Sequence, residues 1–171
     1  MSTNTALIIK TGIACAISVL AGFVAGPAAA QQRLDAPTFV RTASASDAFE
    51  IQSSRLALER SGNPRVRAFA EHMINDHSMT TAQLSQNAPS LVMFGGPGML
   101  DERHAAMLSQ LSAQNGPAFD RLYDQMQLAA HREAIALYSA YATTGDNPAL
   151  VSLTRNTLPV LRQHFAMARR L

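Results

Sequence analysis

Residues 62–64, Gly-Asn-Pro, and residues 145–148, Gly-Asp-Asn-Pro, decide the fold, because each stretch ends one helix and begins another. Glycine is typical just after a helix C-terminus, asparagine caps the next N-terminus, and proline fits its first turn. Apolar residues recur at helical spacing around both stretches, with no competing β alternation. The sequence therefore predicts two helical hairpins, with helices over about residues 37–61 and 64–87 and over about 117–143 and 148–170.

A long connector, residues 88–116, joins the two hairpins. It contains residues 95–98, Gly-Gly-Pro-Gly, and a short helical pattern over about 101–112. Helices of about 25 residues are roughly 37 Å long, a distance that this connector can span. An up-down-up-down bundle needs only a few residues there, whereas a crossover bundle needs a long return. We therefore predict an all-α fold, a ferritin-like four-helix bundle with one long crossover connection carrying a short extra helix.

Residues 1–30 have the pattern of a secretory signal peptide. Lys10 precedes the apolar run 11–25, and residues 28–30, Ala-Ala-Ala, fit the small-residue cleavage rule. We expect cleavage after Ala30 and a periplasmic or secreted domain over residues 31–171. Retention of the leader as an anchor is left open, and after cleavage we expect no stable membrane span.

Removing the leader removes the only lysine, Lys10, and the only cysteine, Cys15. Thirteen arginines then face twelve acidic residues, so we expect no nucleic-acid partner. The missing thiol excludes disulfides and thiolate metal sites, and the missing lysine excludes Schiff-base chemistry. Imidazole and carboxylate are the chemistry that remains. A protein partner is not identified, and a homo-oligomer is left open.

Ionisable side chains fall on the apolar stripes of the helices at about 100° per residue. On the last helix Leu150, Leu153, Val160 and Leu161 define a stripe with His164 in its middle. Distances from the hairpin turns place the inward groups near the middle of the bundle, so they are able to converge. The candidate metal ligands are Glu50, His77, Asp120, Asp124, His131 and His164.

Burying such groups is costly unless they are paired or coordinated. In one interpretation they bind a divalent metal such as zinc, manganese or iron. In the other they form a hydrogen-bonded network that fixes helix register, in a non-catalytic cell-envelope binding or scaffolding module. A pH-responsive bundle is a third interpretation. We assign no catalytic residue and leave open whether the protein is an enzyme.

Three motifs together resemble a known family. They are Phe69-Ala70-x-x-Met73-x-x-Asp76-His77, Phe119-Asp120-x-x-Tyr123 followed by His131, and Leu158-Pro159-x-Leu161-x-x-His164. From about Phe39 onward the chain resembles a bacterial exported helical family catalogued as domain of unknown function 4142 and grouped with ferritin-like folds. The resemblance implies a signal peptide, a ferritin-like bundle and an extracytoplasmic location, but no activity. It also implies recurrent polar positions at Glu50, Asp76, His77, Asp120, His131 and His164.

Ferritin-like di-iron sites use Glu-x-x-His motifs, and here the chain departs from that template. The residues three positions before His77, His131 and His164 are Ile74, Leu128 and Leu161. A histidine-rich site for a single ion therefore fits the sequence better than a carboxylate-bridged iron pair. We predict an exported helical-bundle protein of undetermined cellular role with a mid-bundle cluster of histidines and carboxylates, and we leave open whether that cluster binds a divalent metal or is structural.

Overall fold

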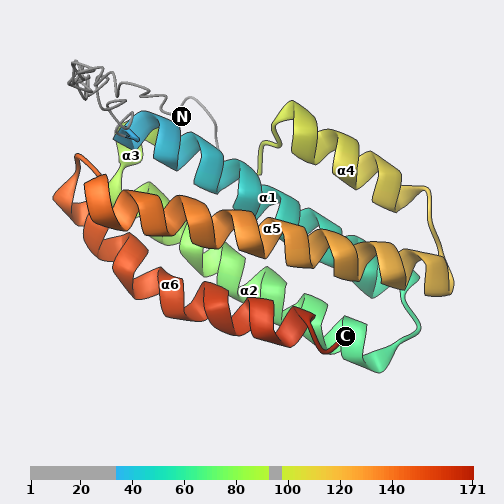
Figure 1. The fold of residues 1–171 in the computed structure, drawn as a ribbon. Coiled ribbons are helices and arrows are strands. Elements are labelled where there is room, and N and C mark those ends of the chain that lie inside the picture. Colours follow the sequence, from blue (N-terminus) through green and yellow to red (C-terminus); the bar gives the residue numbers. More distant parts are fainter. Residues whose placement is uncertain (1–33, 93–97) are drawn as a thin grey trace, which may run out of the picture. The chain divides into compact units, whose positions relative to one another are not determined.

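Four long helices and two short ones make up the part of the chain that the structure describes, residues 34–92 and 98–171 of a computed structural model (Figure 1). The helices are α1 (Ala36–Arg60), α2 (Pro64–Asn87), α3 (Pro89–Val92), α4 (Glu102–Ser112), α5 (Gly116–Thr144) and α6 (Pro148–Ala168). The four long helices agree with the predicted ranges to within two residues. The predicted leader, with Lys10 and Cys15, and residues 95–97 of the connector lie outside the described residues.

The asparagine caps begin α2 and α6, as the sequence predicted. The Asn63 side chain accepts a hydrogen bond from the backbone N–H of Arg65, and Asn147 accepts from those of Ala149 and Leu150. Pro64 and Pro148 are the first residues of their helices. These caps satisfy backbone donors that have no partner within the helix, so the hairpin turns are fixed by local chemistry.

The two turn glycines differ in what they do. Neither Gly62 nor Gly145 has a positive φ, so neither ends its helix in the left-handed conformation that favours glycine. A Cβ at Gly145 would lie 2.6 Å from Cε1 of Tyr141, whereas a Cβ at Gly62 would meet nothing within 4 Å. Tyr141 stacks on Phe39 with ring centroids 4.2 Å apart, so Gly145 makes room for a core aromatic ring.

The pairing of α1 with α5 establishes the topology. Phe39, early in α1, packs on Tyr138, late in α5, while Ser54 shares a 2.8 Å hydrogen bond with Tyr123, so these helices are antiparallel. α2 is also antiparallel to α1, its hairpin partner, and therefore runs parallel to α5 (Figure 1). The chain must return along the bundle between α2 and α5, which confirms the predicted crossover connection.

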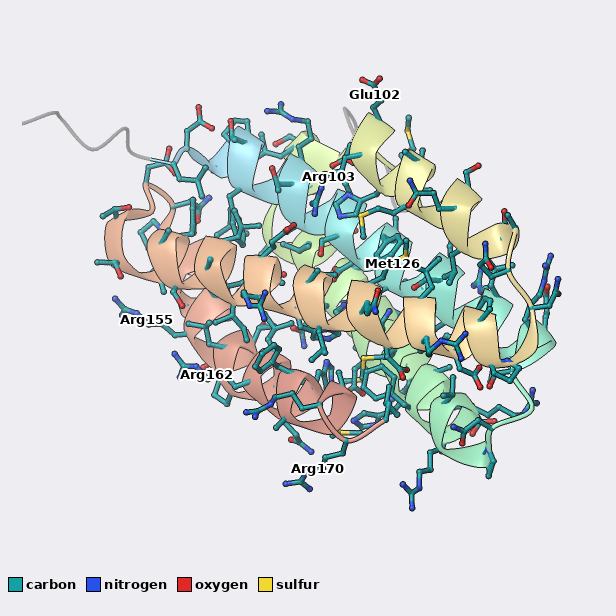
Figure 2. The ribbon with its side chains drawn as sticks, turned by 45° about the vertical axis from the view of Figure 1, so that its right-hand side comes forward. Glu102, Arg103, Met126, Arg155, Arg162 and Arg170 are labelled. Atoms are coloured by element: carbon teal, nitrogen blue, oxygen red, sulfur yellow. The ribbon has the colours of Figure 1, made fainter. Side chains whose placement is uncertain are left out.

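The crossover connection carries two helices rather than one. The single turn α3 was not predicted, while α4 lies against the outside of α1 and α5. Figure 2 shows Arg103 on α4, whose guanidinium donates to the exposed Glu133 carboxylate of α5 at 2.7 Å. His104 of α4 is buried, with its ring centroid 5.3 Å from that of Phe49.

Two apolar clusters fill the bundle, one toward each end. One cluster contains Phe39, Leu84, Tyr138 and Leu150, and the other contains Phe49, Phe69, Met73, Phe119 and Tyr123. On α2, α5 and α6 the buried histidines fall between residues of the first cluster and residues of the second. The core is therefore divided by a polar layer.

The predicted stripe on α6 is wrong at one position. Val160 is 38% exposed, whereas Leu150, Leu153 and Leu161 are buried. Figure 2 shows Arg155 and Arg162 of α6 directed away from the bundle, as is Arg170 just after the helix, so one face of α6 is charged and solvated. None of the helices within the described residues combines the length and the apolar character needed to cross a bilayer.

Candidate metal centre

Three histidine rings meet in the polar layer of the bundle. His77 of α2, His131 of α5 and His164 of α6 are 2%, 0% and 1% exposed. Their ring centroids are 5.6, 5.5 and 5.4 Å apart, which is nearly an equilateral triangle. One ring nitrogen from each residue lies within 4.8 Å of the other two. The structure thus brings together three of the six residues that the sequence singled out as metal ligands.

Each of these rings has one nitrogen fixed by a hydrogen bond. His77 Nδ1 is 2.8 Å from Asp47 Oδ1, His164 Nε2 is 2.9 Å from Asp76 Oδ2, and His131 Nδ1 donates to the backbone carbonyl of Gln127 at 2.9 Å. A carbonyl or an ionised carboxylate only accepts, so the anchored nitrogen carries the proton in the neutral ring. The second nitrogen of each ring then has a free lone pair.

These second nitrogens are buried and have no partner among the described residues. They are His77 Nε2, His131 Nε2 and His164 Nδ1. Histidine ligands in metal proteins usually have this arrangement, in which the far nitrogen donates to a carboxylate or carbonyl that sets the tautomer and the ring orientation. In their neutral form the three rings are therefore held as a set of nitrogen donors.

The protein environment keeps two of the rings uncharged at neutral pH. Burial lowers the pKa of His131 to about 3 and that of His164 to about 4, with the charge of His77 adding to both effects. Burial also opposes a charge on His77, but its hydrogen bond to Asp47, together with the negative charges of Asp47, Glu50 and Asp76, outweighs this and raises the pKa of His77. A metal ion binds the deprotonated nitrogen, so a neutral ring is the form that coordinates.

Glu50 of α1 lies beside the triad. Both of its carboxylate oxygens are buried with no hydrogen-bond partner among the described residues, and Oε1 is 3.6 Å from His131 Nδ1. Burial raises the pKa of Glu50 to about 7, so its charge is held at a cost. A cation in the triad would relieve that cost, although Glu50 itself does not belong to the group of converging ligand atoms.

The other two predicted carboxylates do not join the triad. Asp120 and Asp124 are half-buried on α5, about two turns and one turn further from the histidines than Gln127 is, and neither belongs to a group of converging ligand atoms within the described residues. Each has one buried oxygen without a partner. Burial and the nearby charge of Asp120 raise the pKa of Asp124 to about 6. Gln127 donates to Ser53 at 3.1 Å and so links α5 to α1 instead.

Asp47 is a site residue that the sequence reasoning missed. It is 3% exposed and binds both His77 and Thr81, at 2.8 and 3.3 Å. Every residue of α1 from Ala43 to Glu50 is buried, so the helix has no exposed side there and the helical wheel gave no contrast. The available signal was the spacing of Asp47 and Glu50, three residues apart and hence on one face of the helix.

The comparisons with known proteins bear on the fold and the family. No curated protein matches the chain. Among solved structures, one described as CopM in the Cu(II)-bound form matches with a TM-score of 0.65 at 16% sequence identity, covering 80% of this chain and 94% of that one. That likeness supports the helical-bundle fold, while kinship with ferritins stays a prediction. The model of the family described as "Domain of unknown function (DUF4142)" matches residues 23–171, and the chain therefore belongs to that family.

Proposed function

We propose that the protein binds a late first-row transition-metal ion in the middle of the bundle, through His77 Nε2, His131 Nε2 and His164 Nδ1. The observation that carries this proposal is the set of three converging rings, each anchored through one nitrogen and each with its other nitrogen buried and unpaired. A buried polar atom without a partner costs about 1–3 kcal/mol, so three in one place need an explanation. Coordination supplies one.

The spacing of the rings suits such an ion. Three nitrogens at about 2.1 Å from a tetrahedral ion are about 3.4 Å apart. Ring nitrogens that already lie within 4.8 Å of one another reach this spacing by small ring rotations. Asp47 and Asp76 hold the outer nitrogens of His77 and His164, and with Glu50 they place negative charge around a dication. The donor set and its surroundings thus fit a cation.

The donor set also favours particular metals. Imidazole nitrogen suits copper and zinc, and Cu(II) binds such sites more tightly than its neighbours in the series, whereas manganese prefers oxygen ligands. Zinc is the best fit of the three ions suggested by the sequence, and copper fits at least as well. The name of the similar solved structure refers to bound Cu(II), which supports copper as the first ion to test.

The burial of the triad favours binding over catalysis. His77, His131 and His164 are at most 2% exposed, and Glu50 is 1% exposed, so no face of the cluster is open to a substrate. A catalytic zinc site keeps one coordination position open to water or substrate. When bound, the ion would supply strong coordination bonds across α2, α5 and α6, and the residues around it hold it in place and exclude water.

A titration of the metal-free protein tests the proposal. After removal of metals with a chelator, Cu(II) or Zn(II) is added and stoichiometry, affinity and the unfolding midpoint are measured. We expect one ion per chain and a raised midpoint, because a ligand that binds only the folded state stabilises it. His131→Gln is expected to abolish this shift. Its circular dichroism and its midpoint without metal show whether the variant still folds.

His104→Gln is the matched control for that experiment. His104 is also buried, at 5% exposure, and its Nδ1 contacts Asp101, but it does not belong to the triad. This variant should keep full metal binding. The proposal fails when the wild type shows no saturable binding of either ion, or when folded His131→Gln binds as tightly as the wild type.

The second candidate function is a scaffolding module whose polar layer is structural. The observation that favours it is the set of side-chain hydrogen bonds between helices, Ser54 to Tyr123, Gln127 to Ser53 and His77 to Asp47. Such a network fixes the register of packed helices. For this function, His131→Gln lowers the midpoint of the metal-free protein while added metal changes neither the wild type nor the variant.

We also propose that the domain acts outside the cytoplasm, with residues 1–30 removed as a signal peptide. The apolar run and the small residues before Gln31 support this. Expression in a bacterium followed by mass spectrometry of the periplasmic fraction tests it. A mature chain that begins at Gln31 is the expected result, and an unprocessed chain in the cytoplasm would contradict it.

A further inference from the structure

A second set of metal-ligand side chains lies between the buried triad and the surface. His72, Asp76 and His164 each place one ligand atom within 4.8 Å of the other two. A single oxygen, Asp76 Oδ2, is 2.9 Å from His164 Nε2 and 3.4 Å from His72 Nε2. The rings of His72 and His164 are 5.3 Å apart between centroids. His164 therefore belongs to both sets.

The two sets differ in their access to solvent. The side chains of His72 and Asp76 are 39% and 21% exposed, whereas that of His164 is 1% exposed. The other neighbours of the triad, Asp47 and Gln127, are 3% and 0% exposed. Among the residues that hold the three rings in the described part of the chain, Asp76 is thus the one that reaches solvent.

The two nitrogens of His164 belong to different environments. Nε2 contacts the outer carboxylate of Asp76, and Nδ1 is buried and unpaired on the side of the triad. An imidazole ring is able to coordinate through either nitrogen. In the neutral ring Nε2 carries the proton that it donates to Asp76, so Nδ1 has the lone pair for the ion, and His164 joins the outer carboxylate to the inner position.

The surface beside Asp76 has features suited to a hydrated cation. Asp76, Met79, Asn156 and Val160 line a groove of about 180 Å³ between α2 and α6. Met79 is 55% exposed at this groove, and a thioether is a further donor for soft ions. A carboxylate and an exposed imidazole replace some of the water around a first-row ion, while the rest of its hydration shell stays in contact with solvent.

We propose that His72 and Asp76 form the port through which metal ions reach and leave the buried triad, with His164 as the residue that joins the outer position to the inner one. This inference rests on the proposed function of the triad. The ion is held first at His72 Nε2 and Asp76 Oδ2 and then passes to the lone pair of His164 Nδ1, while the proton on His164 Nε2 stays in place. No bond other than metal–ligand bonds is formed or broken.

Binding kinetics test the port. The association rate of Cu(II) or Zn(II) with the metal-free protein is measured by stopped flow, and the dissociation rate by transfer of bound metal to a chromogenic chelator. In His72→Gln both rates should fall by the same factor, about tenfold for the loss of one imidazole ligand, with the dissociation constant within about twofold of wild type. A port speeds both directions equally because uptake and release follow one path.

Glu71→Gln is the matched control, because Glu71 is exposed on α2 next to His72 in the sequence. It should change both rates by less than twofold. Unchanged rates in His72→Gln overturn the port, and so does faster dissociation alone, since that would make His72 a ligand of the resting site. If the wild type binds neither ion, both the proposed function and the port fail. If the wild type binds metal but the rates of His72→Gln are unchanged, the port alone fails.

Discussion

His77 Nδ1 lies 2.8 Å from Asp47 Oδ1 between the first two helices of the bundle, where both side chains are at most 5% exposed. This contact leaves His77 Nε2 buried and unpartnered among the described residues, in a ring whose centroid is 5.6 Å from that of His131 and 5.5 Å from that of His164. Asp47 therefore acts on the triad through His77 rather than as a member of it. Residues of this kind set the affinity of a metal site by fixing the tautomer and orientation of its ligands.

Asp47→Asn should weaken metal binding while leaving the bundle folded. The amide keeps the size of the side chain but removes the charge that fixes the His77 proton on Nδ1, so we expect affinity for Cu(II) or Zn(II) to fall by about 10–100-fold. Competition titration against a chelator measures this change. Asp120→Asn, on α5 and outside the triad, is the control and should bind as the wild type does. Equal affinities in all three proteins would contradict the prediction.

The two turn glycines should respond differently to alanine. Gly145→Ala places a Cβ 2.6 Å from the Tyr141 ring and the Tyr141 carbonyl oxygen, so we expect it to destabilise the fold by about 1–3 kcal/mol. Gly62→Ala meets open space at an ordinary φ and should be neutral or stabilising by up to about 1 kcal/mol. Urea unfolding of both variants measures the difference, and equal effects would show that Tyr141 does not constrain its turn.

Asp124→Asn should change the pH dependence of stability. Burial and Asp120 raise the folded-state pKa of Asp124 from 3.8 to about 6, so its contribution to stability is present below about pH 3.8 and lost as the pH rises through about 6. Asp124→Asn has no ionisable group at this position, so its free energy of unfolding does not fall in this way. It should gain roughly 1 kcal/mol over wild type at about pH 7.5, a figure discounted because the side chain is half-buried, and almost nothing at about pH 4.

Urea unfolding at several pH values between those limits measures that difference. Asp120→Asn is the control, because it removes a neighbouring charge that raises the pKa of Asp124. In that background, the difference in unfolding free energy caused by Asp124→Asn should appear at lower pH. A difference that is constant with pH would contradict the assignment of the step to Asp124.

The cap of α6 should contribute measurably to stability. Asn147 accepts hydrogen bonds from the backbone N–H groups of Ala149 and Leu150, and Asn147→Ala leaves both without this acceptor. We expect a loss of about 1 kcal/mol in the free energy of unfolding. Asn147→Ser retains a cap and should lose much less. If both variants unfolded at the same urea concentration as wild type, the prediction would be wrong, and the turn would be held by contacts other than the cap.

The sequence predicted the helices and the inward histidines because both depend on local chemistry. Asn63 and Asn147 cap their helices through their own backbone neighbours, and the helical period fixes which side of α2 carries His77. The choice between Asp47 and Asp124 as a neighbour of the triad depends instead on the rotation and register of α1 against α5, which a helical wheel does not contain. Val160 was misplaced for the same reason, since its side of α6 faces a groove rather than another helix.

The triad is divided between the two hairpins, because His77 belongs to α2 while His131 and His164 belong to α5 and α6. Neither hairpin alone carries three ligands, so the complete site exists only after the hairpins have docked across the crossover connection. With an ion bound, unfolding must also release the metal, and stability rises by about 2.7 kcal/mol when free metal is 100 times the dissociation constant. The lifetime of the chain against proteases would then follow the supply of metal.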